Sequence, residues 1–87
     1  MKYEYDNSFK RDAKKAPSII LSQLPLIIKS ISSASSIFEI SQAKKLKGFK
    51  NIYRIKIDDY RLGIYTDQDT VIFSRLLPRK NIYKKFP

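Results

Sequence analysis

The sequence predicts one small α+β domain in which helices cover one face of a mainly antiparallel β-sheet. Two observations carry this prediction. The first half holds an amphipathic helical pattern, and the second half holds three successive strand-like runs of apolar and polar residues separated by turn residues. With 87 residues, of which 43% are hydrophobic, the chain has room for one compact core. We therefore treat residues 1–87 as a single domain.

The first half is expected to form a short strand followed by two helical segments. Residues 2–5, "KYEY", alternate in the manner of a strand. Ser8 is a suitable N-cap for the first helix, and Pro17 can open the second as its first residue. Pro25 predicts a kink or a break within that second segment, and the serine-rich run 32–36 ends it. Its apolar residues recur at helical spacing and define a face that packs on a sheet: Ile20, Leu24, Ile27, Ile28 and Ile31.

The second half is expected to form three strands, at residues 52–57, 60–66 and 70–77. A lysine-rich stretch around Gly48 precedes them. It fits either a solvated basic loop or a loop that contacts phosphate groups, and the sequence leaves both interpretations open. Its basic residues are Lys44, Lys45, Lys47 and Lys50.

The first two of these strands form a hairpin whose turn is centred on Asp58 and Asp59. Because side chains alternate along a strand and opposite residues share a face, this turn predicts a register. It pairs Lys56 with Arg61, Arg54 with Gly63 and Ile52 with Tyr65. One face is then entirely apolar or aromatic and belongs to the core: Tyr53, Ile55, Ile57, Tyr60, Leu62 and Ile64.

The opposite face of the hairpin collects positive charge. It carries Arg54, Lys56 and Arg61, and Gly63 leaves space beside Arg54. Like charges directly opposed on a sheet destabilise it by a few tenths to about 1 kcal/mol, so the pairing of Lys56 with Arg61 indicates a function.

The net charge of the chain favours a polyanionic partner. It is +10 overall, and residues 44–87 contribute twelve Lys/Arg against four Asp/Glu, whereas residues 1–43 contribute six against four. An excess of this size on a small domain favours nucleic acid. A solubilising surface and an interface for an acidic protein are the alternatives.

The composition excludes several kinds of catalytic site. The chain has no histidine and no cysteine, which removes Ser-His-Asp and Cys-His sites, paired-histidine ribonuclease sites and His/Cys zinc sites. Two pairs of aspartates, Asp58 with Asp59 and Asp67 with Asp69, fit tight turns better than a metal site. The polar start of the chain lacks the apolar segment of a secretory signal, and no stretch is long enough to span a membrane, so a cytosolic protein is expected.

The remaining basic and aromatic residues suffice for cleavage of RNA by attack of its own 2′-OH. That reaction needs a base, cations that stabilise the phosphorane and an acid for the leaving 5′-oxygen. Neighbouring positive charges favour the neutral form of a lysine, so Lys56 is the candidate base. Arg61 and Arg79 are expected to hold the phosphate, and Tyr83 to stack on a nucleobase or to act as the acid. Alternatively, Tyr83 and Phe86 belong to a C-terminal turn that packs its aromatic rings on the core.

Two segments resemble a known family. "KKLKGFKNIYRIKIDDYRLGIY" and "VIFSRLLPRKNIYKKFP" resemble the toxin component of bacterial RelE/ParE-superfamily toxin-antitoxin modules, which share a "KLxG…YRIRxGDYRxxY" core and an "HRxxIYxxFP" ending. The resemblance covers nearly the whole chain. It implies a small α+β fold, a cognate antitoxin as partner and, for RelE-like members, ribosome-dependent cleavage of mRNA in the A site without metal or cofactor.

The resemblance also assigns residues. The basic positions of the RelE-like subgroup fall on Arg54, Lys56, Arg61 and Arg79, with Tyr83 near the C-terminal tyrosine. Arginine stands at position 54 where lysine occurs in the best-known subgroup, so the role of base rests on Lys56. A ParE-like toxin that inhibits DNA gyrase, and a degenerate toxin that only binds its antitoxin, are the alternatives. RNA contacts are expected from five basic side chains: Arg54, Lys45, Lys47, Lys50 and Lys80.

Overall fold

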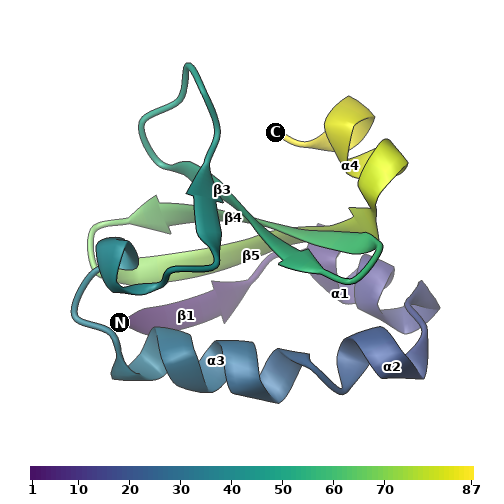
Figure 1. Cartoon of the computed structure of the whole chain (residues 1–87), viewed down its shortest axis with the longest axis horizontal. Coiled ribbons are helices and arrows are strands. Elements are labelled where there is room, and N and C mark those ends of the chain that lie inside the picture. Colours follow the sequence, from purple (N-terminus) through teal and green to yellow (C-terminus); the bar gives the residue numbers. More distant parts are fainter.

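The computed structural model describes residues 1–87 and is built around a five-stranded sheet in the order β1-β5-β4-β3-β2 (Figure 1). Every neighbouring pair is antiparallel except β1 and β5, which are parallel. This confirms the predicted fold class. The strands are β1 (Lys2–Tyr5), β2 (Ala43–Lys45), β3 (Ile52–Ile57), β4 (Tyr60–Asp67) and β5 (Thr70–Pro78).

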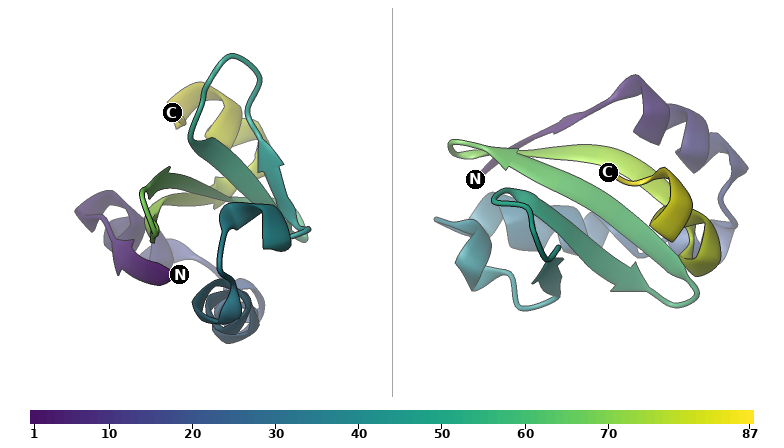
Figure 2. Two further views of the ribbon diagram at one scale, coloured as in Figure 1. Left: turned by 90° about the vertical axis from the view of Figure 1, so that its left-hand side faces the viewer. Right: turned by 90° about the horizontal axis from the view of Figure 1, so that it is seen from above.

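Helices lie on both sides of this sheet. Three N-terminal helices and a short 3-10 turn lie on one side, and the C-terminal helix stands on the other side (Figures 1 and 2). The expected N-terminal helical layer is therefore confirmed, whereas the C-terminal helix adds a second layer. The helices are α1 (Asn7–Lys15), α2 (Ser18–Leu21), α3 (Leu24–Ser33) and α4 (Arg79–Lys85), and the 3-10 turn is Ile37–Glu39.

The core lies between the N-terminal helices and the sheet. The predicted apolar hairpin face is buried, with Leu62 and Ile64 each 0% exposed. From the helical side, Ile20, Ile27 and Ile31 enter the same cluster. The helical spacing and the strand alternation thus identified the two surfaces that meet.

The helix boundaries differ in detail from those expected. Helix α1 begins at Asn7, one residue before the predicted N-cap Ser8. The Ser8 hydroxyl instead donates a hydrogen bond of 2.6 Å to the carbonyl oxygen of Ser74 in β5. Pro17 has an extended backbone conformation and precedes α2, so it is the N-cap of that helix and not its first helical residue. The predicted break is confirmed, because α3 begins anew at Leu24 with a proline in its first turn.

The edge of β5 beyond the end of β1 is covered by α1. The Asp12 carboxylate accepts hydrogen bonds from Nε of Arg75 at 2.7 Å, from its Nη2 at 3.1 Å and from the backbone N–H of Leu76 at 3.0 Å. Both charged side chains are largely buried, at 23% exposure for Arg75 and 10% for Asp12. The hydrogen bond to Asp12 raises the pKa of Arg75.

Replacing Asp12 by alanine should lower the free energy of unfolding by about 2–3 kcal/mol, because it leaves a largely buried guanidinium and a backbone N–H without partners. Chemical denaturation of Asp12→Ala measures the loss. Asp67→Ala, which removes an exposed carboxylate at the end of β4, is the matched control. Equal losses in the two variants would contradict this assignment.

Candidate functional site

The outer face of the β3–β4 hairpin carries the basic residues that the sequence placed there. The observed register pairs Lys56 with Arg61 and Arg54 with Gly63, around a two-residue turn at Asp58 and Asp59. This confirms the predicted register. Asp58 adopts a left-handed conformation (φ 53°), which aspartate tolerates better than most residues, so the hairpin closes without a glycine.

The like charges of Lys56 and Arg61 are kept apart by the path of the Arg61 side chain. Its Nη1 donates hydrogen bonds to the carbonyl oxygens of Asp58 at 3.0 Å and Tyr60 at 2.8 Å. The guanidinium therefore lies along the turn. Lys56 is exposed and forms no ion pair.

Helix α4 brings two further site residues onto this face. Its first backbone N–H, from Arg79, donates a 2.8 Å hydrogen bond to the carbonyl oxygen of Asp59 in the hairpin turn. One helical turn later, the Tyr83 hydroxyl accepts a hydrogen bond of 3.3 Å from Nε of Arg79. The guanidinium carbon of Arg54 lies 4.7 Å from the centre of the Tyr83 ring. Arg54, Arg79 and Tyr83 form what we call the arginine–tyrosine cluster.

The cluster changes the acidity of its tyrosine. The hydrogen bond from Arg79, together with the charges of Arg79 and Arg54, lowers the pKa of Tyr83. Positive neighbours stabilise the phenolate, so the phenol gives up its proton more readily than a free tyrosine does. The Tyr83 ring is 53% exposed, which leaves its hydroxyl accessible to a bound molecule.

Replacing Arg54 by glutamine should raise the pKa of Tyr83 toward its ordinary value, because one of the charges that stabilises the phenolate is lost. The tyrosinate absorbance of each protein, minus that of its Tyr83→Phe derivative, follows this one phenol among six tyrosines. The Lys84→Gln variant removes a charge from the same helix and should leave the titration where it is. An unchanged titration in Arg54→Gln would show that Arg54 does not act on the phenol.

The structure joins some predicted site residues and separates others. Arg54, Arg79 and Tyr83 are in contact, whereas no hydrogen bond or cation–π contact joins Lys56 or Arg61 to any of them. Lys56 instead lines a small hollow of about 150 Å³ between the start of α3 and strands β2 and β3. The basic face thus has two parts. One is the arginine–tyrosine cluster, where α4 meets β3, and the other is the Lys56–Arg61 pair at the end of the hairpin.

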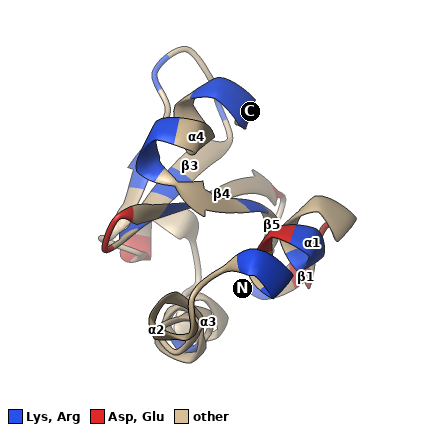
Figure 3. Ribbon diagram, turned by 90° about the vertical axis from the view of Figure 1, so that its right-hand side faces the viewer, with Lys and Arg blue, Asp and Glu red and all other residues tan.

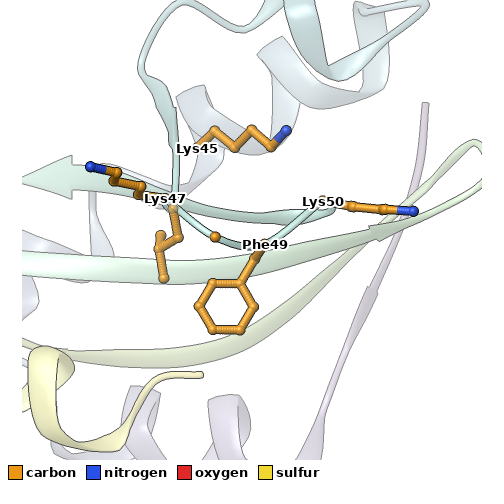
Figure 4. Close-up of a pocket in the computed structure, with 6 residues that line it drawn as sticks. Lys45, Lys47, Phe49 and Lys50 are labelled. Atoms are coloured by element: carbon orange, nitrogen blue, oxygen red, sulfur yellow. The ribbon is translucent and has the colours of Figure 1, made fainter.

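The lysine-rich stretch forms partly a strand and partly a loop. Lys44 and Lys45 belong to β2, which pairs with β3, so the expectation of a loop is wrong for this part. The remainder, residues 46–51, is a loop on the same side of the sheet as α4 (Figures 1 and 2). It surrounds a shallow hollow of about 350 Å³. Figure 4 shows the side chain of Lys47 extending to one side and those of Lys45 and Lys50 to the other, while the Phe49 ring projects below the loop.

Phe49 was missed by the sequence argument. Its ring is 45% exposed, and no acidic residue lines the hollow beside it. An exposed aromatic side chain among lysines is the combination that single-stranded nucleic acids bind, since rings stack on bases while cations contact phosphates. The interleaving of Phe49 with Lys47 and Lys50 was the available signal.

Positive charge gathers on the side of the sheet that bears α4. Figure 3 shows blue segments on α4, on β3 and on the projecting loop, and also on α1 beside red ones, whereas α2 and α3 are almost entirely uncharged. No group of three or more His, Cys, Asp or Glu side chains is placed to hold a metal ion, and both aspartate pairs lie at turns. None of the helices combines the length and the apolar character that crossing a membrane requires.

The whole chain is similar to known toxins. No family model matches the sequence. The chain is similar to Toxin RelE3 of Methanocaldococcus jannaschii, at 40% identity over 88 residues that cover all of both chains. A chain of the RelB-RelE antitoxin-toxin complex from Methanococcus jannaschii shares its structure with a TM-score of 0.79 and 38% identity, covering 95% of this chain and 98% of that one. YafQ from E. coli has the same fold at 16% identity, with a TM-score of 0.72 over 94% of this chain and 97% of its own.

Proposed function

The chain belongs to the RelE family of toxins, and we propose that it is the toxin of a type II toxin-antitoxin pair that cleaves messenger RNA on the ribosome. The arginine–tyrosine cluster carries this proposal. It presents two guanidinium groups and an acidified phenol on one exposed surface, which suits binding and cleavage of a phosphodiester.

The reaction is an attack of the 2′-oxygen of RNA on the adjacent phosphorus, which breaks the bond to the 5′-oxygen and leaves a cyclic phosphate. Lys56 is assigned to take the 2′-OH proton, because its exposed amine is accessible to a bound RNA and no carboxylate pairs with it. Arg61 and Arg79 stabilise the charge on the phosphorane oxygens. Tyr83, with its lowered pKa, gives its proton to the leaving 5′-oxygen.

These roles need no metal ion. Proton transfer is assigned to a lysine and a tyrosine, and charge stabilisation to arginines, so every step is assigned to a side chain of this protein. Arg54 contributes charge beside the scissile phosphate and does not act as a base, because a guanidinium stays protonated.

The partner that silences the toxin is a RelB-type antitoxin. The related RelE from Methanococcus jannaschii was solved with RelB. We propose that an acidic or amphipathic segment of the antitoxin covers the basic face, since complementary charge steers such partners together. The area around the outer hairpin face and α4 offers exposed cations and the exposed Tyr83 ring for this contact.

Phe49 and its lysine neighbours extend the RNA surface beyond the cluster. Phe49→Ala should weaken binding of single-stranded RNA by about 1–3 kcal/mol, the contribution of one base stacked on an aromatic ring. Phe49→Tyr should retain the affinity. Phe38, 86% exposed in the 3-10 turn on the other side of the molecule, provides the control variant Phe38→Ala. Equal affinities of Phe49→Ala and wild type in a fluorescence binding assay would exclude stacking on this ring.

The proposed function is tested with purified toxin, translating ribosomes and a defined mRNA. Cleavage that appears only when ribosomes carry the message supports the proposal. The cleavage should also persist after a chelator removes magnesium, in a sample whose ribosomes are stabilised by a polyamine instead. Inhibition of DNA gyrase without any cleavage of RNA would replace it with the gyrase-directed alternative.

A further inference from the structure

The C-terminal end of α4 is anchored over Gly63 of β4. A Cβ atom at position 63 would lie 2.7 Å from Cδ2 of Phe86 and 2.8 Å from two further carbons of the same ring. Any side chain at this position would displace the ring. The Phe86 ring is 7% exposed and Ile82 is fully buried, although neither belongs to the main core on the opposite side of the sheet. The glycine at position 63 predicts open space beside Arg54, and in the structure the ring of Phe86 fills that space.

This anchor lies directly beside the arginine–tyrosine cluster. Gly63 and Arg54 are cross-strand partners, so the side chain of Arg54 emerges next to the ring of Phe86. The other end of α4 is tied to the hairpin turn through the backbone hydrogen bond from Arg79 to Asp59. A helix of seven residues that is held at both ends has one position on the sheet, and that position sets where Tyr83 stands relative to Arg54.

We propose that Phe86, seated on Gly63, is a positioning residue that holds Tyr83 against Arg54 for RNA cleavage. Phe86 is buried and so does not touch the substrate; it acts through the helix. The inference rests on the proposed function for its effect on turnover. Its effect on the Tyr83 environment can be measured without RNA.

The first test is Phe86→Ala, which empties the slot and leaves every charged group in place. The kcat of cleavage should fall about 10- to 100-fold, since a displacement of a catalytic group by about 1 Å has an effect of this size. KM should stay unchanged, because the lysines still bind RNA. In the same variant the pKa of Tyr83 should rise toward its ordinary value, because the phenol loses its contact with Arg54. Difference titration against the matching Tyr83→Phe protein measures this.

The second test approaches the same contact from the sheet. Gly63→Ala should reproduce both effects, because its methyl group takes the place of the ring. The Gly63→Ala/Phe86→Ala double variant should lose little more kcat than either single variant, since each change alone already removes the contact between the ring and the sheet. Phe86→Leu, which refills part of the slot, should restore part of kcat and of the Tyr83 titration. Phe38→Ala, a change of the same kind at a ring that is 86% exposed, should alter neither.

The outcomes separate positioning from mere stability. A Phe86→Ala protein that melts earlier but keeps the kcat and the Tyr83 titration of the wild type would overturn the proposal. If Gly63→Ala does not fold, the Phe86→Ala and Phe86→Leu pair still decides. Absence of RNA cleavage by the wild type would defeat the proposed function alone, because the titration still reports whether Phe86 sets the position of Tyr83.

Discussion

Replacing both Lys56 and Arg61 by alanine should reduce ribosome-dependent RNA cleavage by about 10²- to 10⁴-fold, the usual contribution of a positioned base. Lys56 supplies the base and Arg61 a charge for the phosphorane. The fold should survive, because Lys56 is exposed and the hydrogen bonds of Arg61 reach only carbonyl oxygens at an exposed turn. Cleavage of a defined mRNA under single-turnover conditions measures the effect.

A matched control separates this role from loss of charge in general. The Lys14→Ala/Lys15→Ala variant removes the same number of charges from exposed positions at the end of α1, away from the basic face. It should cleave at close to the wild-type rate. If the two double variants lose activity to the same extent, Lys56 and Arg61 contribute only to long-range attraction of RNA.

Replacing Arg79 by alanine should lower cleavage by about 10²- to 10³-fold, the cost of losing one preorganised donor to a developing negative charge. Arg79 also donates a hydrogen bond to Tyr83, and this bond is the largest cause of the lowered pKa of Tyr83. The Tyr83 phenol of Arg79→Ala should therefore titrate at higher pH than that of the wild type. Single-turnover cleavage and the tyrosinate difference titration measure the two effects.

Lys84 provides the control for Arg79, since it is an exposed cation on the same short helix whose side chain forms no hydrogen bond or cation–π contact with Tyr83. Lys84→Ala should retain both cleavage and the Tyr83 titration. Arg79→Lys keeps the charge but loses the planar fork, so it should recover only part of the rate. Full activity in Arg79→Ala would remove this residue from the mechanism.

The hairpin face was predictable because strand parity depends on sequence alone. Once the turn was placed at Asp58 and Asp59, the apolar alternation fixed which side chains pointed inward, since a shift of one residue would have exposed Leu62 and Ile64. The amphipathic spacing in α3 and the break before Pro25 followed from equally local rules.

Strand β2 and the position of the C-terminal helix were not predictable in the same way. Strand β2 is only three residues long and lysine-rich, so its sequence shows no apolar alternation that would predict its pairing with β3. The position of Phe86 depends on a long-range contact with Gly63, which neither residue signals by itself. The spacing of Ile82 and Phe86, four residues apart, was a local sign of a helix with one buried side.

The most direct test of the account is the mapping of mRNA 5′ ends after brief induction of the toxin, with wild type, the Lys56→Ala/Arg61→Ala variant and a sample in which translation is blocked. We predict new ends within translated codons in the wild type, and none in the variant or the blocked sample. Growth arrest without new RNA ends would contradict the assignment of this toxin as a ribosome-dependent ribonuclease.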